Sequence, residues 1–471
     1  MEATSRSFPA NARRALADWG LQDALHTMAR QGFAVKRAQA AARLPEFETL
    51  RGLAKDMKNE VLQNLDFYLE TYERAVSAAG GVVHWCRDAA EARAAVLTIC
   101  RTAGARIVTK GKSMIGEEIA LNEHLEAAGF EPVETDLGEY IIQIRHEPPS
   151  HIVAPAVHLS KEQVAESFRA THRDLDPDRP LSEPRQMLDE ARALLRRKFL
   201  AAEVGITGAN FLIAETGSSI IVTNEGNGDL TQSLPRVHIV LASIEKVVPT
   251  LEDATLLLRL LARSATGQEF STYTTVSTGP KRADDLDGPE EYHVILLDNG
   301  RSALLGGEMQ DMLRCIRCAA CLNHCPVYGA IGGHAYGWVY PGPMGAVLTP
   351  TLIGVGEAGH LPNASTFCGR CESVCPMQIP LPNLMRHWRE REFDARLAPA
   401  AARYGIALWS FLALHPRLYR FVAEAAARVL GWCGMKRGRF RTLPLAAGWT
   451  NVRDMPAPQG RSFMSQWAKR R

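Results

Sequence analysis

The first 80 residues carry a repeat of apolar positions that is typical of helices. Along residues 51–76 these positions recur every four residues, at Leu53, Met57, Val61, Leu65 and Leu69. Side chains spaced in this way lie on one face of a helix. The pair Gly80 and Gly81 interrupts the pattern. The sequence therefore predicts an N-terminal helical segment over residues 1–80.

From residue 81 to residue 300, short apolar runs alternate with longer helical patterns. The predicted strands are Val82–Trp85, Arg106–Thr109, Ile141–Ile144, Phe211–Ala214, Ser219–Thr223, Val237–Ala242 and His293–Leu297. The predicted helices are Ala89–Thr102, Ile115–Ala128, Lys161–Phe168, Ser182–Ala202 and Leu251–Ser264. Strands that alternate with helices indicate an α/β domain with a largely parallel sheet.

Beyond residue 300 the strand pattern stops and cysteines appear. Helical segments are expected at Glu308–Ile316 and Leu381–Phe393, on either side of a stretch rich in Gly and Pro at residues 329–362. The sequence predicts an all-α, cysteine-bearing domain over residues 301–395. A basic, helical C-terminal region follows over residues 396–471.

Composition adds one asymmetry to this picture. Apolar residues make up 46% and charged residues 23% of the 471 residues, as in ordinary soluble proteins. The net charge is only +2, but residues 386–471 contain 17 Lys and Arg against 5 Asp and Glu. Such a tail favours docking to a partner protein, a membrane surface or nucleic acid, and the alternative is a solvated tail with many arginines. Nucleic acid is disfavoured because the tail shows no recognisable platform of interleaved aromatic residues for reading bases.

Two expected absences bear on location. The N-terminus lacks the apolar stretch of a secretory signal, and no window holds about 18 uncharged apolar residues. We therefore expect no transmembrane segment and a cytoplasmic location, with peripheral contact at the inner membrane face as an alternative. Cytosolic thiols at short spacing are typical of metal sites and not of disulfides.

Seven of the ten cysteines lie in two tight runs. The first run, Cys315-x2-Cys318-x2-Cys321-x3-Cys325-Pro, has the spacing of bacterial ferredoxins. The second run is Cys368-x2-Cys371-x3-Cys375-Pro. In two-cluster ferredoxins the fourth cysteine of each run binds the other cluster. The spacing therefore assigns Cys315, Cys318, Cys321 and Cys375 to a [4Fe-4S] cluster 1, and Cys325, Cys368 and Cys371 to cluster 2.

Cluster 2 is one cysteine short. Ser365 stands where a fourth cysteine would be expected, three residues before Cys368. Cluster 2 is therefore either a [4Fe-4S] cluster with incomplete cysteine ligation or a [3Fe-4S] cluster, unless a lone cysteine reaches in from elsewhere. Zinc is the alternative metal, but it takes four ligands per site, and a rhythm that ends in Cys-Pro is unusual for it.

The α/β domain offers weaker candidates. Lys110 and Lys112 follow a predicted strand and precede a helix, a position that can hold an anion. The alternative is an ordinary helix start with solvated lysines, and the P-loop spacing is absent. Glu215, at a predicted turn between two strands, is a weak catalytic candidate as a general base or nucleophile.

The order of these parts resembles the lactate-utilisation protein B family, the iron–sulfur subunits of a bacterial L-lactate oxidising complex. The resemblance spans nearly the full chain and rests on the two cysteine runs together with residues 110–118, 215–227 and 296–301. It implies a lactate-utilisation domain similar to the sugar-phosphate isomerase and CoA-transferase group, and a helical ferredoxin module. It also implies the same seven cluster cysteines, and two partner subunits, one with cysteine-rich repeats similar to heterodisulfide reductase.

The resulting expectation is an electron-transfer subunit that passes electrons from L-lactate, which becomes pyruvate, through two clusters. We expect it to be a non-autonomous part of an oxidoreductase complex. The alternative is a redox sensor or scaffold, in which the clusters are structural and the α/β domain is a ligand-binding module.

Overall fold

The computed structural model describes residues 3–111, 113–443, 450 and 453–470. The chain divides into two compact units, Met1–Glu392 and Phe393–Arg471.

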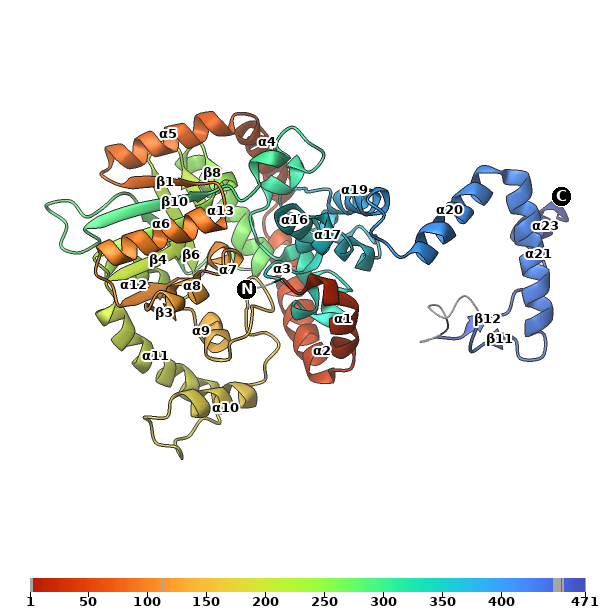
Figure 1. The fold of residues 1–471 in the computed structure, drawn as a ribbon, viewed down its shortest axis with the longest axis horizontal. Helices are drawn as coiled ribbons and strands as arrows, with labels where there is room; N and C mark the ends of the chain where they lie inside the picture. Colours follow the sequence, from red (N-terminus) through yellow and green to blue (C-terminus); the bar gives the residue numbers. More distant parts are fainter. Residues whose placement is uncertain (1–2, 112, 444–449, 451–452, 471) are drawn as a thin grey trace. The chain divides into compact units, whose positions relative to one another are not determined.

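A six-stranded parallel sheet forms the centre of the first unit (Figure 1). Its strand order is β1–β10–β7–β4–β2–β3. The strands are β1 (Val82–Cys86), β2 (Ile107–Lys110), β3 (Glu131–Glu134), β4 (Val204–Gly208), β7 (Val237–Ser243) and β10 (Glu291–Leu297). All five pairings are parallel. The predicted α/β fold with a largely parallel sheet is therefore confirmed.

Both faces of this sheet are buried, as expected for parallel sheets. Ile239 and Leu241 of β7 face a core built by α6 (Ala89–Thr102), α7 (Met114–Glu118) and α8 (Leu121–Ala127). Val240 and Ala242 face the opposite core, which includes α5 (Leu65–Ala78). Near β2 and β3, α11 (Pro184–Ala201) covers Ile107 and Val133. The period-two alternation of apolar side chains thus explains why helices cover the sheet on both sides.

A second, four-stranded sheet has the order β8–β5–β6–β9. Its strands are β5 (Phe211–Ile213), β6 (Ser218–Thr223), β8 (Val247–Val248) and β9 (Tyr273–Ser277). Helices α4 (Phe47–Gln63) and α13 (Leu251–Ala265) pack together beside it, and α12 (Asn227–Ser233) lies near β4 and β6. Gly217 in the β5–β6 turn has φ +68°, and a Cβ there would lie 2.4 Å from the Val76 nitrogen. A glycine is needed where this turn meets α5.

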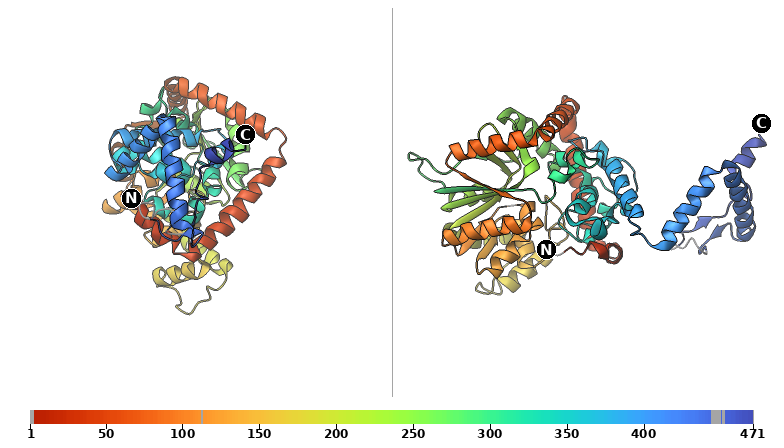
Figure 2. Two further views of the ribbon diagram at one scale, coloured as in Figure 1. Left: turned by 90° about the vertical axis from the view of Figure 1, so that its right-hand side faces the viewer. Right: turned by 45° about the horizontal axis from the view of Figure 1, so that its top comes forward.

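The cysteine-bearing segment forms a layer of short helices beside one end of the large sheet (Figure 2). These helices are α14 (Ala320–Asn323), α15 (Tyr328–Ile331), α16 (Gly342–Ile353), α17 (Val355–Ala358), α18 (Arg370–Ser373) and α19 (Leu381–Asp394). The chain's first helices contact this layer: α1 (Phe8–Leu16), α2 (Trp19–Leu25), the π-helix His26–Ala34 and α3 (Val35–Ala42) share its core. The predicted N-terminal helical segment therefore serves two neighbours, because α5 covers the sheet while α1 and α2 cover the cysteine layer.

The second unit consists of α20 (Ala400–Leu414), α21 (Pro416–Gly434), the strand pair β11 (Arg439–Phe440) and β12 (Met455–Pro456), and α23 (Phe463–Ala468). Large apolar side chains on α20 and α21 are exposed, Trp409 by 63% and Phe421 by 72%. Within the described residues, no helix combines the length and the apolar character that a membrane crossing requires.

Several predicted elements differ from the structure. Ile141–Ile144 belongs to helix α9 (Leu137–Ile144) and not to a strand, because Asp136 accepts hydrogen bonds from the Gly138 and Glu139 nitrogens and so caps a helix start. The single helix predicted at Ile115–Ala128 is two helices, since Ala120 adopts φ 53° between them. At β3, β4, β8 and β9 the sequence predicts no strand. The predicted boundaries at residues 80, 300 and 395 stay predictions.

Candidate iron–sulfur centre and adjoining cleft

The two cysteine runs have the same sequence of backbone conformations. Arg317 (φ 58°) and Ala319 (φ 62°) flank Cys318, and Phe367 (φ 52°) and Gly369 (φ 78°) flank Cys368. Each run then enters a one-turn helix, α14 in the first and α18 in the second. Left-handed residues on both sides of a cysteine bend the chain into a tight loop. Two such loops in one fold are what a paired set of cluster-binding loops requires.

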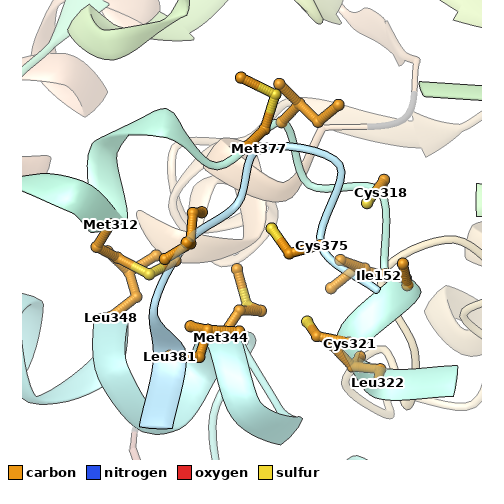
Figure 3. Packing of buried hydrophobic residues seen from close by; sticks show 14 of the residues in the cluster. Ile152, Met312, Cys318, Cys321, Leu322, Met344, Leu348, Cys375, Met377 and Leu381 are labelled. Carbon is orange, nitrogen blue, oxygen red and sulfur yellow. The ribbon is translucent and has the colours of Figure 1, made fainter. Parts of the chain in front are cut away.

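Four thiols meet at one cavity. Cys315, Cys318, Cys321 and Cys375 all line it, and its other walls are mainly apolar, including Ile152, Met344 and Leu381. Figure 3 shows Cys318, Cys321 and Cys375 around a common space, although Cys375 comes from the second run. The first loop therefore supplies three thiols and the second supplies the fourth.

Burial sets the chemistry of these thiols. It raises the pKa of Cys318 to about 12, and negative charge on Cys375 and Cys315 adds to the shift. Burial likewise raises the pKa of Cys375 to about 11, with Cys315 as a charged neighbour. The thiolate is the metal-binding form, so iron binding here releases protons.

The other three thiols form a second set. Burial raises the pKa of Cys371 to about 12, and Cys325 and Cys368 are its charged neighbours. Cys368 is exposed, whereas Cys371 is buried. The two sets adjoin, because Cys371 is also among the neighbours that raise the pKa of Cys321, after burial itself.

These donor sets fit iron–sulfur clusters. In the described part of the chain, no three His, Cys, Asp or Glu side chains converge on a position for a single metal ion. A four-iron cube binds each thiolate through a different iron atom, so its ligands stand further apart than those around one zinc ion. The four-thiol set matches the ligand demand of a cube, and the three-thiol set leaves one position without a cysteine.

Two buried arginines donate hydrogen bonds to backbone carbonyls of the second cysteine run. Arg51 donates through Nη2 to the Cys375 carbonyl at 2.7 Å. Arg37 donates through Nη2 to the Val374 carbonyl, also at 2.7 Å. Both come from the N-terminal helices α3 and α4. Positive charge beside a cluster offsets the charge of its thiolates and influences its reduction potential.

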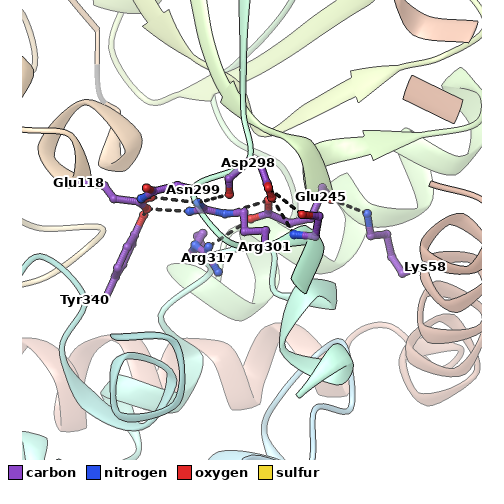
Figure 4. Close-up of polar contacts among 9 residues, drawn as sticks. Lys58, Glu118, Glu245, Asp298, Asn299, Arg301, Arg317 and Tyr340 are labelled. Carbon is purple, nitrogen blue, oxygen red and sulfur yellow. Dashed lines mark hydrogen bonds and ion pairs between the residues drawn. The ribbon is translucent and has the colours of Figure 1, made fainter. Parts of the chain in front are cut away.

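A buried ionic network joins the first cysteine loop to the α/β domain (Figure 4). Arg301 is fully buried and binds Glu118 with two hydrogen bonds, of 2.9 and 2.6 Å. Its Nε lies 3.1 Å from Glu245, which also accepts a 3.2 Å hydrogen bond from Arg317. Tyr340 donates to Glu118 at 2.6 Å. Although burial opposes ionisation, Arg301 and Arg317 lower the pKa of Glu245 to about 2.

A cleft of about 420 Å³ opens next to this network. Residues that follow strands β2, β3, β4 and β7 line it, among them Ser113, Asp136, Asn210 and Lys246. Arg317, Cys318 and Tyr340 of the cysteine segment form another wall. The cleft therefore lies between the carboxyl ends of the strands and the four-thiol cavity.

The other candidates from the sequence lie elsewhere. Lys110 is buried, and its Nζ lies 2.7 Å from Glu134 and 3.2 Å from Glu117, so an anion site there stays a prediction that these carboxylates disfavour. Lys112 lies outside the described residues. Glu215 is exposed in the β5–β6 turn and is not part of the cleft wall, so its catalytic role stays a prediction.

Sequence reasoning did not single out Lys246, Glu245 or Arg317 as site residues. Their signals were present but weak. Glu245 and Lys246 come soon after an apolar strand, and Arg317 lies inside the cysteine run. Only the topology brings them together.

Comparison with known proteins decides the family. Residues 69–297 match the description "LUD domain", residues 311–379 match "4Fe-4S dicluster domain", and residues 391–471 match "Lactate utilisation protein B, C-terminal". The chain is 41% identical to lactate utilization protein B of Lysinibacillus sphaericus, over 100% of this chain and 98% of that protein. The chain belongs to the lactate utilisation protein B family.

Other members of the lactate utilisation protein B family are similarly close. The Bacillus subtilis protein is 43% identical over 94% of this chain and 92% of its own length. The Macrococcus caseolyticus protein is 44% identical over 91% and 90%. A solved DUF162 family structure from Deinococcus radiodurans is 14% identical to this chain. The match covers 50% of this chain and 98% of that one, with a TM-score of 0.29.

Proposed function

We propose that this chain is the electron-transfer subunit of a complex that oxidises L-lactate to pyruvate. The observation that carries the proposal is the grouping of seven cysteines into two adjoining sets, the four-thiol set lying beside a cleft of about 420 Å³. The names of the related proteins support lactate as the starting point.

The reaction releases two electrons and two protons from each lactate molecule. Iron–sulfur clusters accept and release single electrons, so two adjoining clusters can take one electron each, while the protons pass to solvent. In this proposal Cys315, Cys318, Cys321 and Cys375 hold a [4Fe-4S] cluster. Cys325, Cys368 and Cys371 hold the second cluster, which is a [4Fe-4S] cluster with incomplete cysteine ligation or a [3Fe-4S] cluster.

Residues of this chain hold the first cysteine loop in place and keep water away from its thiols. Through the hydrogen bond from Arg317 to Glu245, the ionic network of Glu118, Glu245 and Arg301 fixes the first cysteine loop against the α/β domain. The apolar walls of the four-thiol cavity exclude water, which protects a cluster and helps to set its potential. The chain thus supplies the thiolates and a dry cavity, and it holds this cavity next to the cleft.

The proposal includes two partner subunits, one of them with cysteine-rich repeats, and a cytoplasmic location. The C-terminal unit supports a partner, because it exposes large aromatic side chains on α20 and α21 together with many arginines. Aromatic residues and arginine are enriched at protein interfaces. We therefore propose that this unit docks on a partner subunit.

The test is a cysteine substitution in the assembled complex. The full chain, purified without oxygen, should contain about seven or eight irons. L-lactate should reduce these clusters only when the partner subunits are present. Cys318→Ser removes one thiolate of the four-thiol set and should abolish electron flow from lactate. Cys86→Ser is the matched control, because Cys86 lies in strand β1, outside both sets and outside the proposed docking unit. Unchanged lactate oxidation in Cys318→Ser would favour a sensor or scaffold.

A further inference from the structure

The cleft lies at the point in the sheet where the order of successive strands reverses. From β2 the chain proceeds to β3 at one edge, and from β4 it proceeds through β7 and β10 toward the other edge. The switch point therefore falls between the neighbouring strands β2 and β4. Open α/β sheets bind ligands in the crevice outside the carboxyl ends of the strands at such a point. Ser113 after β2 and Ala209 after β4 both line the cleft.

Three lysines are buried in the described part of the chain, and they differ in their partners. Lys58 donates to the Glu245 and Val247 carbonyls at 2.7 and 3.0 Å. Lys110 pairs with Glu134 and Glu117. Lys246 is only 7% exposed and lines the cleft, and no described residue forms a hydrogen bond or an ion pair with its Nζ. A buried ammonium without a partner is costly, so its position at a cleft wall points to an external anion.

Arg317 adds a second cation at the same wall. Its Nη2 donates to Glu245, and its guanidinium carbon lies 5.2 Å from the centre of the Tyr340 ring. These two contacts orient the guanidinium and leave most of its five N–H donors for a ligand. A planar guanidinium binds a carboxylate through two parallel hydrogen bonds.

The two carboxylates near this wall form their ion pairs with the arginines and not with Lys246. Glu245 is shared between Arg301 and Arg317, and Arg301 is also bound by Glu118. Within this group the two carboxylates of Glu118 and Glu245 face the two guanidinium groups. Glu245 and Cys315 are the negatively charged neighbours of Lys246, but no described residue forms an ion pair with its Nζ. A ligand with a negative charge would supply that ion pair.

The same wall adjoins the four-thiol cavity. Ile152, Arg317 and Cys318 line both the cleft and that cavity. An anion held by Lys246 and Arg317 is therefore separated from the first thiol set by no more than one layer of side chains.

We propose that this cleft binds the carboxylate of a small 2-hydroxy or 2-oxo acid, with Lys246 and Arg317 as its anchors, next to the four-thiol set. The inference rests on the proposed function for the class of acid, but the site itself depends only on the cleft and its two cations. It assigns substrate binding to this chain and not to a partner subunit.

The test measures binding and not turnover. The full chain, purified with its clusters and without oxygen, is titrated in a calorimeter with L-lactate, with pyruvate and with lactamide, which lacks the negative charge. Lys246→Met should weaken lactate and pyruvate binding about tenfold to a hundredfold, the cost of one charge-assisted hydrogen bond. It should not change the response to lactamide. Lys246→Arg should restore much of the affinity, and Lys281→Met, an exposed lysine outside the cleft, should bind like the wild type.

A second measurement does not depend on the variants folding. In the wild-type protein, pyruvate should protect Lys246 from an amine-reactive reagent, followed by mass spectrometry, and lactamide should not. Equal lactate affinity in Lys246→Met, or no protection of Lys246 by pyruvate, overturns the site but leaves the electron-transfer proposal standing. Conversely, a chain that binds lactate at Lys246 but contains no iron would keep the site and overturn the proposed function.

Discussion

Ser365 occupies, in the second cysteine run, the backbone position that Cys315 occupies in the first. The Cys315 nitrogen donates to the Met312 carbonyl at 3.1 Å, and the Ser365 nitrogen donates to the Pro362 carbonyl at 3.0 Å. Two residues later each chain passes through a left-handed residue, Arg317 or Phe367. The Ser365 hydroxyl accepts a 3.2 Å hydrogen bond from the Phe367 nitrogen. The loop for a fourth ligand is thus present without its thiol.

Restoring that thiol should change the second cluster. In Ser365→Cys, the three-thiol set gains a fourth thiolate at the matching loop position, so we expect a complete four-iron cluster that resists loss of iron in air. Iron analysis and electron paramagnetic resonance before and after exposure to air measure this. Ser365→Ala is the matched control and should resemble the wild type. If Ser365→Ala loses the second cluster, the hydroxyl itself is a ligand.

The network around Arg301 should dominate local stability. Arg301→Met leaves Glu118 and Glu245 buried with too little positive charge, so we expect a loss of about 3–5 kcal/mol in the free energy of unfolding. Urea denaturation at pH 7 measures it. Arg236→Met is the control, since Arg236 pairs with Glu291 near the surface and its side chain is 42% exposed. That change should cost less than about 1 kcal/mol. An equal decrease in the free energy of unfolding in the two variants would mean that the buried network stabilises the protein no more than a surface ion pair does.

His238 should make stability depend on pH. Burial lowers its pKa to about 3, and its Nε2 hydrogen-bonds with Thr207 at 2.9 Å. The unfolded chain binds a proton at this histidine below about pH 6.5, whereas the folded chain does not until about pH 3. The free energy of unfolding should therefore fall as pH decreases through this window, by about 1.4 kcal/mol per pH unit from this residue.

The measurement for His238 is a comparison of slopes. Urea denaturation of the wild type and of His238→Gln between about pH 5.5 and 4.5 should give a shallower pH dependence for the variant. His26→Gln, at an exposed position in the N-terminal helices, should keep the wild-type slope. Parallel curves for wild type and His238→Gln would show that His238 is protonated in the folded protein.

The C-terminal unit should matter for assembly and not for cluster binding. Trp409→Glu places a charge within the exposed apolar surface of α20 and should prevent co-purification with the partner subunits, while iron content stays unchanged. Phe67→Glu is the control, because Phe67 is an aromatic residue of α5 with similar exposure, 58%. Loss of iron in Trp409→Glu, or co-purification at wild-type levels, would contradict the docking role.

Much of the fold could be predicted from local patterns. Helix α6 was predicted with the same limits as observed, because Asp88 caps its start and its apolar positions repeat regularly. Ile141–Ile144 is rich in β-branched residues, which are typical of strands, but the Asp136 cap starts helix α9 there. Strands β3 and β4 were missed because Pro132, Gly205 and Gly208 break the apolar run that marks a strand.

In the candidate site, too, one part could be predicted from the sequence and another could not. The grouping of the thiols could be predicted, since ligand spacing along a tight loop is a local property of the chain. The cleft could not, because Lys246 and Arg317 are 71 positions apart in the sequence and meet only through the strand order and the buried pairs of Glu245. Their charges alone do not distinguish them from solvated residues.

The central claim is that two cysteine loops together hold two iron–sulfur clusters. Mössbauer spectroscopy of the full chain, produced with iron-57 and purified without oxygen, tests it most directly. We predict signals from two clusters, one of them a four-iron cube that is lost in Cys375→Ser although Cys375 belongs to the second run. Colourless protein that contains zinc and no iron would contradict the account.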